Sequence, residues 1–146
     1  MYTRILVPID GSEHAKQALS VACKLLDKKA STLYLLHVPE TLDYTTTLVW
    51  GIGAIDASVT LAEREKSGEQ LLKQAINSAQ EEGAQYIEKI LTRGDPVRVI
   101  LDTANAKDID TIVMGSRGLS DFAGVVIGSV SHKVSHSAKC RVITVS

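Results

Sequence analysis

A glycine-rich segment is the strongest chemical signal in this sequence. It begins with Gly115-Ser116-Arg117-Gly118, and nine residues then separate Gly118 from Gly128-Ser129. The apolar run before it, residues 111–114, predicts a buried strand, and residues 130–134 predict a helix. Glycines leave room for a close ligand and can adopt positive φ, while the start of a helix offers unpaired N–H groups and a positive dipole end. The spacing therefore predicts an anion site, and the phosphate of a nucleotide is the leading ligand.

Glycines can also serve a turn alone, without binding phosphate. An ordinary connection from strand to helix has about two to six residues, and the interval from Gly115 to Gly128 is longer. Long loops of this kind are more often functional. The sequence contains no Gly-x-x-x-x-Gly-Lys-Ser/Thr motif, and no Gly-x-Gly-x-x-Gly after a strand. Any phosphate site here is therefore of a different type.

Length and composition limit the classes of function. A chain of 146 residues predicts one domain, residues 1–146. Sixteen Lys and Arg and 17 Asp and Glu give a net charge of −1 without a basic stripe, which argues against nucleic acid as a partner. No apolar run approaches the roughly 20 residues of a membrane span, and the first residues predict a strand, not a signal peptide. We expect a cytoplasmic protein in which Cys23 and Cys140 are small buried hydrophobes.

Short β-branched and aliphatic runs alternate with helical periods along the whole chain. The runs predict strands at residues 4–9, 32–38, 86–92, 111–114 and 141–145. Ser12 suits the N-cap of the first helix, and Pro96 suits the first turn of the third. This order predicts an open α/β fold, with a mainly parallel five-stranded sheet and helices on both faces. Such sheets bind ligands where the strand order reverses, so Asp10-Gly11-Ser12 and the glycine segment are expected to face one another.

Residues 39–57 interrupt the pattern. They contain Trp50, the single tryptophan of the chain, and Gly51-Ile52-Gly53. A packed surface loop and a lid or partner-binding loop are both consistent with this composition. The sequence leaves the two interpretations open.

The sequence resembles the universal stress protein family over essentially its whole length. The resemblance rests on residues 5–12, 33–38 and 94–96, and above all on residues 114–118 and 128–131. The last two segments are similar to the Gly-x2-Gly-x9-Gly-Ser/Thr signature of the branch of the family that binds ATP. The resemblance implies a Rossmann-like fold of the adenine nucleotide alpha hydrolase type.

The resemblance also implies a binding site. In it, the backbone of Val38 would meet the edge of adenine, beside Pro8 and Asp10. Asp10 would bind ribose or hold Mg²⁺ through water, or it only forms a turn; these alternatives stay open. The residues implied around ribose and phosphates are Met114, Gly115, Ser116, Arg117, Gly118, Gly128, Ser129, Val130 and Ser131. No Lys or Arg lies between the two halves of the signature and Asp121 adds a negative charge, so AMP or ADP would compete with ATP.

Together with the resemblance, these residues imply an ATP-binding regulatory protein of the stress response that acts as a nucleotide-responsive homodimeric switch. The last strand, residues 141–146, would form the dimer if it lies at the sheet edge, as the resemblance implies. A regulatory protein partner is compatible with this role. The alternatives are a slow ATPase or self-phosphorylating protein, with Ser129 or Ser131 as acceptor, and a nucleotide-free interaction dimer. No catalytic residue is assigned.

The four histidines are not expected to perform chemistry. His132 and His136 have the spacing of a helical metal site, but no third ligand accompanies them, and an exposed helix face explains them better. His37 ends an apolar strand and is expected to be packed or hydrogen-bonded near the site. His14 is expected on the surface.

Overall fold

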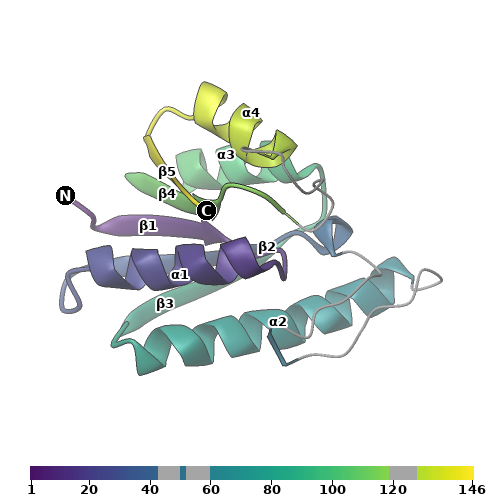
Figure 1. Ribbon diagram of the computed structural model, residues 1–146, viewed down its shortest axis with the longest axis horizontal. Coiled ribbons are helices and arrows are strands. Elements are labelled where there is room, and N and C mark those ends of the chain that lie inside the picture. Colours follow the sequence, from purple (N-terminus) through teal and green to yellow (C-terminus); the bar gives the residue numbers. More distant parts are fainter. Residues whose placement is uncertain (43–49, 52–59, 119–127) are drawn as a thin grey trace.

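The computed structural model describes residues 1–42, 50–51, 60–118 and 128–146. Five parallel strands form one sheet in the order β3-β2-β1-β4-β5, as Figure 1 shows. The strands are β1 (Arg4–Pro8), β2 (Thr32–His37), β3 (Tyr86–Leu91), β4 (Thr111–Gly115) and β5 (Arg141–Val145). The helices are α1 (Glu13–Leu25), the short 3-10 helix η1 (Pro39–Thr41), α2 (Leu61–Glu81), α3 (Pro96–Ala106) and α4 (Ser129–Ser137). The predicted α/β fold is confirmed.

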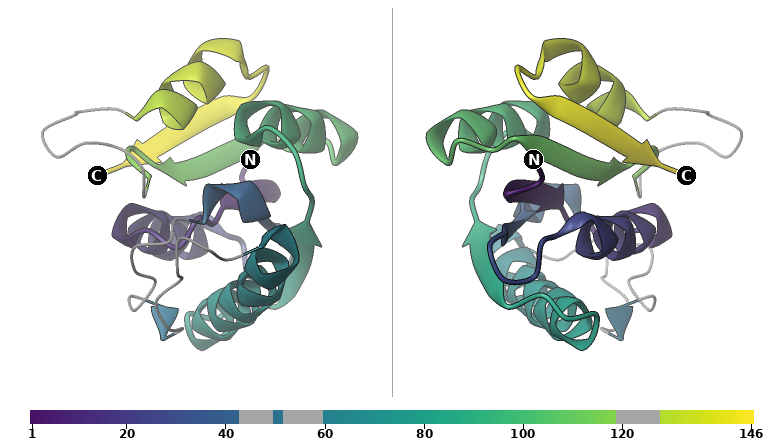
Figure 2. Two further views of the ribbon diagram at one scale, coloured as in Figure 1. Left: turned by 90° about the vertical axis from the view of Figure 1, so that its right-hand side faces the viewer. Right: turned by 90° about the vertical axis from the view of Figure 1, so that its left-hand side faces the viewer.

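Helices cover both faces of the sheet because successive side chains of a strand point to opposite sides. Figure 2 shows α1 and α2 on one face and α3 and α4 on the other. The first face packs Ile5, Val7, Leu33 and Leu35 against Ala18, Leu19, Leu72 and Ala75. The second packs Leu6, Tyr34, Ile112 and Met114 against Val99, Ile100 and Val134. The apolar runs of the sequence are thus buried from both sides, as a parallel sheet requires.

Three of the four long helices begin at a side-chain cap. Ser12 Oγ accepts from Ala15 N, Thr60 Oγ1 from Glu63 N, and Asp95 Oδ2 from Arg98 N. The predicted cap at Ser12 and the predicted place of Pro96 in the first turn of α3 are both confirmed. Helix α4 begins after Gly128, which has no side chain to accept such a bond. Its first turn therefore differs chemically from the other three.

The two central strands pair over a short distance. Strand β1 pairs with β2 at five positions, but with β4 only at Ile5↔Thr111 and Leu6↔Ile112. At the amino end of this pair, Asp110 Oδ2 accepts from Thr3 N, Thr3 Oγ1 and Arg4 N at 2.7–2.9 Å. Toward the carboxyl ends this pairing stops. This is the place at which the strand order reverses.

The structure adjusts several expectations. Strands β1, β2 and β3 each end one residue before the predicted limit, and β4 extends one residue further, to Gly115. Trp50 is only 4% exposed and belongs to the core on the α1 face, so this residue is packed. Residues 43–49, 52–59 and 119–127, with Gly53, Asp121 and Gly124, lie outside the described residues, so the question of a lid is not tested. No described helix has the length and hydropathy to cross a membrane.

Candidate functional site

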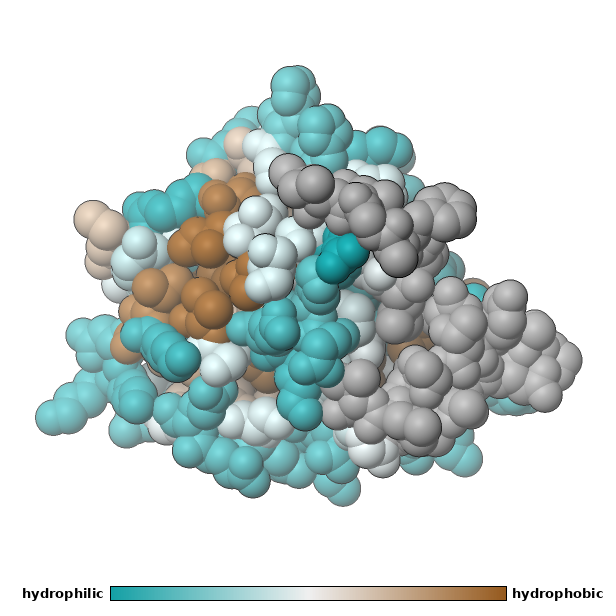
Figure 3. Space-filling model, in the orientation of Figure 1, coloured by the Kyte–Doolittle hydropathy of each residue, from teal (hydrophilic) through white to brown (hydrophobic). Residues whose placement is uncertain are grey.

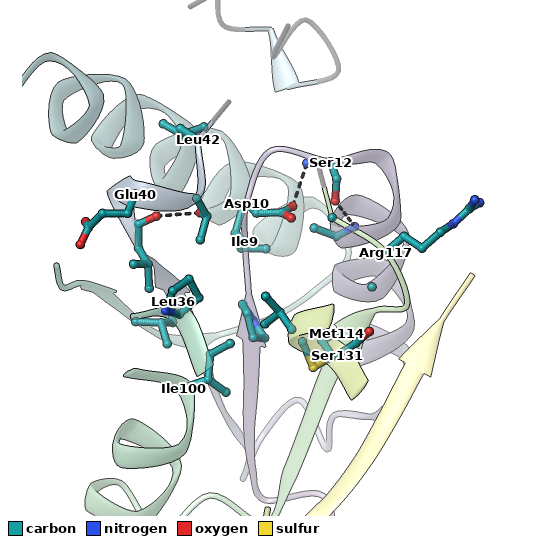
Figure 4. Close-up of a pocket in the computed structure, with 18 of the residues that line it drawn as sticks. Ile9, Asp10, Ser12, Leu36, Glu40, Leu42, Ile100, Met114, Arg117 and Ser131 are labelled. Carbon is teal, nitrogen blue, oxygen red and sulfur yellow. Dashed lines mark hydrogen bonds between the residues drawn. The ribbon is translucent and has the colours of Figure 1, made fainter. Parts of the chain in front are cut away.

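A cavity of about 380 Å³ opens at the carboxyl ends of β1 and β4, where their pairing has ended. This volume lies within the range of small-molecule sites. Figure 4 shows its walls, which come from both halves of the sheet. They are formed by Pro8, Ile9, Asp10, Ser12, Ala15, Leu36, Val38, Glu40, Thr41, Leu42, Arg64, Pro96, Ile100, Met114, Gly115, Arg117, Gly118, Ser129, Val130 and Ser131.

The walls divide into an apolar part and a polar part. Side chains from β2, α3 and β4, among them Leu36, Ile100 and Met114, form the apolar part. The polar part is formed by the connection after β4 and the first turn of α4. Such walls suit a ligand with an apolar portion and a polar or anionic end.

Ser116 links the elements around the polar part. Its N–H donates to Val145 O of β5 at 2.8 Å, and its carbonyl accepts from the N–H of Gly128. The hydroxyl of Ser131 lies 2.8 Å from Ser116 O and 3.1 Å from Gly128 O, and donates to these carbonyls. Ser116 and Ser131 are both buried. The start of α4 is thereby fixed against the end of β4.

The first turn of α4 presents backbone donors toward the cavity. Ser129, Val130 and Ser131 line the wall, and Gly128 provides no side-chain acceptor for their N–H groups. Unpaired N–H groups and the positive end of the helix dipole favour an anion at this point. The polar part is therefore suited to a phosphate group.

The opposite wall is organised by the turn after β1. Asp10 Oδ1 accepts from Ser12 N at 2.9 Å, and Gly11 has a φ of +91°, which favours glycine. Asp10 therefore forms the turn that was considered for it, and its carboxylate also lines the cavity. Trp50 supports this turn from behind, because its Nε1 donates to Ser12 O at 3.4 Å.

His37 is a structural residue beneath the site. Its side chain is fully buried, and Nδ1 donates to Ile9 O at 2.6 Å. Burial lowers the pKa of the imidazole, although the bond to Ile9 opposes this effect. Among the described residues, none offers a hydrogen bond to Nε2, which lies beside Gly68 of α2. The expected role of His37 as a packed and hydrogen-bonded residue is confirmed.

Charged groups lie at several points of the wall. Glu40 Oε2 accepts from Gly94 N at 2.6 Å, which connects η1 to the turn before α3. Arg117 Nη2 lies 3.3 Å from His14 Nε2, and His14 Nδ1 lies 3.2 Å from Ser116 Oγ. Arg64 of α2 reaches the same cavity. The wall therefore carries both signs of charge.

Comparison with known proteins agrees with this geometry. The model of the Universal stress protein family matches residues 1–146. The chain belongs to this family. Universal stress protein YxiE of Bacillus subtilis is 36% identical over 99% of both chains. The solved structure of universal stress protein UspA from Lactobacillus plantarum has a TM-score of 0.80 and 26% identity, with 99% of this chain and 98% of that chain covered.

Two solved relatives contain an adenine nucleotide. The universal stress protein from Archaeoglobus fulgidus in complex with dAMP is 23% identical, with a TM-score of 0.69 over 99% of this chain and 98% of that chain. A universal stress protein family protein from Arabidopsis thaliana with AMP bound is 22% identical, with a TM-score of 0.65 over 98% of this chain and 90% of that chain. At 22% and 23% identity, these two structures show that this universal stress protein shares their fold.

Most of the site residues implied by sequence meet at the cavity. Ten of the twelve line it, from Pro8 on β1 to Ser131 on α4. The other two, Ser116 and Gly128, lie behind the wall and hold it through backbone bonds. Sequence reasoning missed part of the wall, mainly Ile9, Leu36, Leu42, Arg64 and Ile100. The predicted strands at residues 4–9 and 32–38 contain Ile9 and Leu36, but periodicity could not show that these five residues border one space.

The described glycines act differently from the expectation. Gly115 and Gly128 do not adopt positive φ, and the φ of Gly128 is −73°. The described glycines with positive φ are Gly11, Gly51, Gly83 and Gly94. Gly115 is required by contact, because a Cβ there would lie 2.7 Å from His14 Cβ and 2.8 Å from its backbone carbon. The glycine allows α1 to approach β4 closely.

The expectation for His14 was wrong. It is partly buried, and its ring bonds to the connection after β4. His132 and His136 are exposed with stacked rings 6.3 Å apart, as expected for a helix surface. Within the described residues, no group of three or more His, Cys, Asp or Glu is placed to hold a metal ion.

Proposed function

We propose that this universal stress protein binds an adenine nucleotide in the cavity between β1 and β4. The observation that carries the proposal is the pairing, in one space, of an apolar wall with the uncapped first turn of α4. The apolar wall suits a base, and the helix start suits a phosphate. Relatives of the same fold contain AMP and dAMP, which supports the assignment.

The base is assigned to the end of the cavity near Val38. The carbonyl of Val38 accepts from Thr41 N at 2.9 Å and from Thr41 Oγ1 at 2.6 Å, so it already has two partners. Its N–H group remains to donate to the base. Adenine presents an acceptor at N1, whereas guanine presents a donor there, and a site with a fixed donor rejects the wrong base strongly. We therefore propose selectivity for adenine over guanine.

The phosphate is assigned to the other end of the cavity. The N–H groups of Ser129, Val130 and Ser131 and the backbone of Gly118 would surround it, as in a nest of amides. Asp10 would contact ribose, or would hold Mg²⁺ through water when the nucleotide carries more than one phosphate. The carboxylate oxygens of Asp10 are suitable ligands for Mg²⁺. Because the described residues contain no cluster of three metal-binding side chains, phosphate oxygens would supply the other ligands of the ion. ATP, ADP and AMP are the proposed ligands.

We also propose that the protein is a homodimer through β5 and acts in the stress response by changing partner choice with the nucleotide state. Strand β5 is an edge strand, paired only with β4. Figure 3 shows hydrophobic surface on the side of β5 and α1, where Val21, Leu25, Ile143 and Val145 are only partly buried. An edge strand with apolar neighbours favours pairing with a second copy. Ser116 bonds this strand to the phosphate end of the cavity.

The experiment has two parts. Protein purified without added nucleotide is denatured, and the released ligand is identified by chromatography. Calorimetry then compares AMP, ADP and ATP, each with and without Mg²⁺, with GMP as the control for the base. We expect AMP to bind at least tenfold more tightly than GMP, since one unpaired donor costs about 1.4 kcal/mol or more.

A folded protein that releases no nucleotide and binds none of the three adenine ligands would contradict the proposal. Equal affinity for AMP and GMP would contradict the role of Val38 alone. Trp50 offers a second readout, because it donates to Ser12 in the wall of the cavity. Its fluorescence is expected to change when AMP saturates the site.

A further inference from the structure

His14 lies between the two residues that follow β4. Its Nδ1 is 3.2 Å from Ser116 Oγ, and its Nε2 is 3.3 Å from Nη2 of Arg117. A guanidinium can only donate hydrogen bonds, so Nε2 must accept and carries no proton. The proton of the neutral ring therefore resides on Nδ1, which donates to the hydroxyl of Ser116. The contact with Arg117 fixes both the charge and the tautomer of the ring.

Arg117 is thereby held on the side of α1. Its backbone belongs to the phosphate end of the cavity, but Figure 4 shows its side chain extending away from the cavity. The connection after β4 is otherwise tied down by Ser116 through β5 and α4. Arg117 follows β4 at this end of the cavity, and its long side chain has rotamers other than the one that bonds to His14.

We propose that neutral His14 holds Arg117 outside the nucleotide cavity, and that protonation of His14 releases the guanidinium toward the bound phosphate. Protonated His14 has a donor at both nitrogens and cannot accept from Arg117, and the two cations repel each other. Nucleotide binding is then stronger when His14 carries a second proton than when it is neutral. The inference rests on the proposed nucleotide site and assigns His14 as a positioning residue for it.

The charged groups around His14 allow this change. Arg117 faces it from the connection after β4, and Asp10 lies in the turn after β1. Glu13 and Lys16 lie on α1 itself, and Lys16 is directed over the ring of Trp50 at 5.8 Å. Thr144 and Val145, at the near end of β5, have no charge on their side chains. Arg117 is thus the group that responds most directly to the charge of His14.

Two substitutions of His14 separate the states. His14→Gln keeps an acceptor for Arg117 at every pH, whereas His14→Ala removes it. AMP affinity is measured by calorimetry at pH 8 and pH 5.5. At pH 8, we expect His14→Ala to bind AMP about fivefold more tightly than the wild type, and His14→Gln to match the wild type. At pH 5.5, we expect the wild type to bind about fivefold more tightly than His14→Gln.

The affinities of the variants are compared with one another at the same pH. The ionisation of AMP is then the same for all of them and does not affect the ratios. His136→Gln is the control, since His136 is exposed near the end of α4, and it should behave as the wild type at both pH values. In an Arg117→Gln background, substitution of His14 should have no effect on affinity. Nitrogen NMR of the wild type at pH 8 should show the Nδ1–H tautomer of His14 without any ligand.

Several results would overturn the inference. An Nε2–H tautomer, weaker binding by His14→Ala at pH 8, or the same affinity ratios at both pH values would each do so while leaving the proposed site intact. Failure of the folded wild type to bind AMP at either pH would instead remove the proposed function, and this inference with it. Trp50 fluorescence checks that each variant is folded at both pH values.

Discussion

The two ends of the β1–β4 pair differ in how their polar groups are hydrogen-bonded. At the amino end, the carboxylate of Asp110 accepts from two backbone N–H groups, of Thr3 and Arg4, and from the hydroxyls of Thr3 and Thr111. At the carboxyl end, pairing stops after Leu6 and Ile112, and the first turn of α4 has no side-chain cap. One end is satisfied by the chain itself. The other presents its donors to a cavity.

The difference separates stability from binding. A closed network of hydrogen bonds contributes to folding, and loss of one partner leaves others unpaired. Donors that face a cavity contribute little to the fold but are available to a ligand. Substitutions at the amino end should therefore change the free energy of unfolding, and substitutions at the carboxyl end should change affinity.

The largest effect is expected for Gly128→Val. The φ of Gly128 is −73°, which valine can adopt, so the fold should be retained. Gly128 lies behind the cavity wall and holds it through its bond to Ser116, so a valine side chain should shift the first turn of α4 from the proposed phosphate position. AMP binding should weaken more than about a hundredfold, or about 3 kcal/mol. Calorimetry measures the affinity, and urea unfolding measures the stability.

Ser129→Ala is the matched comparison, because it removes a hydroxyl but leaves the backbone donors. We expect a loss of affinity below about tenfold. Wild-type affinity in folded Gly128→Val would show that the start of α4 is not the phosphate site.

Asp110→Ala tests the amino end of the β1–β4 pair. It removes the acceptor of four hydrogen bonds and should lower the free energy of unfolding by about 2 kcal/mol. AMP affinity should stay within about twofold, because Asp110 lies at the far end of the strands. Asp102→Ala, at an exposed position of α3, is the control and should change stability by less than about 0.5 kcal/mol. If Asp110→Ala lost affinity for AMP without losing stability, the amino end would serve binding and not stability, contrary to this comparison.

Gly68→Ala tests the packing of α2 against His37, beneath the carboxyl end of the β1–β4 pair. Alanine normally stabilises a helix relative to glycine, by about 1 kcal/mol. Here a Cβ would lie 2.7 Å from His37 Nε2, so we expect destabilisation by about 1–2 kcal/mol. Gln70→Ala, at an exposed position of the same helix, should be neutral or slightly stabilising. A more stable Gly68→Ala would show that α2 moves away from His37 without cost.

The smallest effect concerns acid sensitivity. Burial lowers the pKa of His37, so the unfolded chain takes up a proton more readily than the folded one. The contribution of His37 to stability is therefore complete above the usual histidine pKa and is lost as pH falls below it. His37→Asn should reduce the slope of unfolding free energy against pH between pH 7 and pH 5, whereas His136→Asn should leave it unchanged. An equal slope in His37→Asn would place the acid sensitivity elsewhere.

The sequence predicted the fold well because its signals are local. Alternation of apolar runs with helical periods indicated five strands and four helices, and Ser12 and Pro96 marked two helix starts correctly. Element limits were less exact, since the last residue of a strand depends on its neighbour: β4 continues to Gly115 because Val145 of β5 pairs with it. The glycine spacing indicated a segment that borders the cavity, although not the close contact with His14 that requires Gly115.

Individual side-chain contacts between distant segments had no signal in the sequence. His14 and Arg117 are 103 positions apart, and their contact depends on how closely α1 approaches β4. Arg64 and Ile100 come from helices on opposite faces of the sheet and meet only at the rim of the cavity. Periodicity assigns a residue to a face of its own element, but it does not state which other element shares that space.

The sequence by itself determined the order of the elements, the parallel sheet and the place of the glycine segment after the fourth strand, because hydrophobic period, caps and glycine spacing are properties of neighbouring residues. The tertiary structure decided which polar groups are bonded by distant segments and which border the cavity. Asp110 is saturated by Thr3, Arg4 and Thr111, whereas the start of α4 faces a cavity. Both outcomes depend on long-range packing, in which β1 and β4 come together at one end and part at the other.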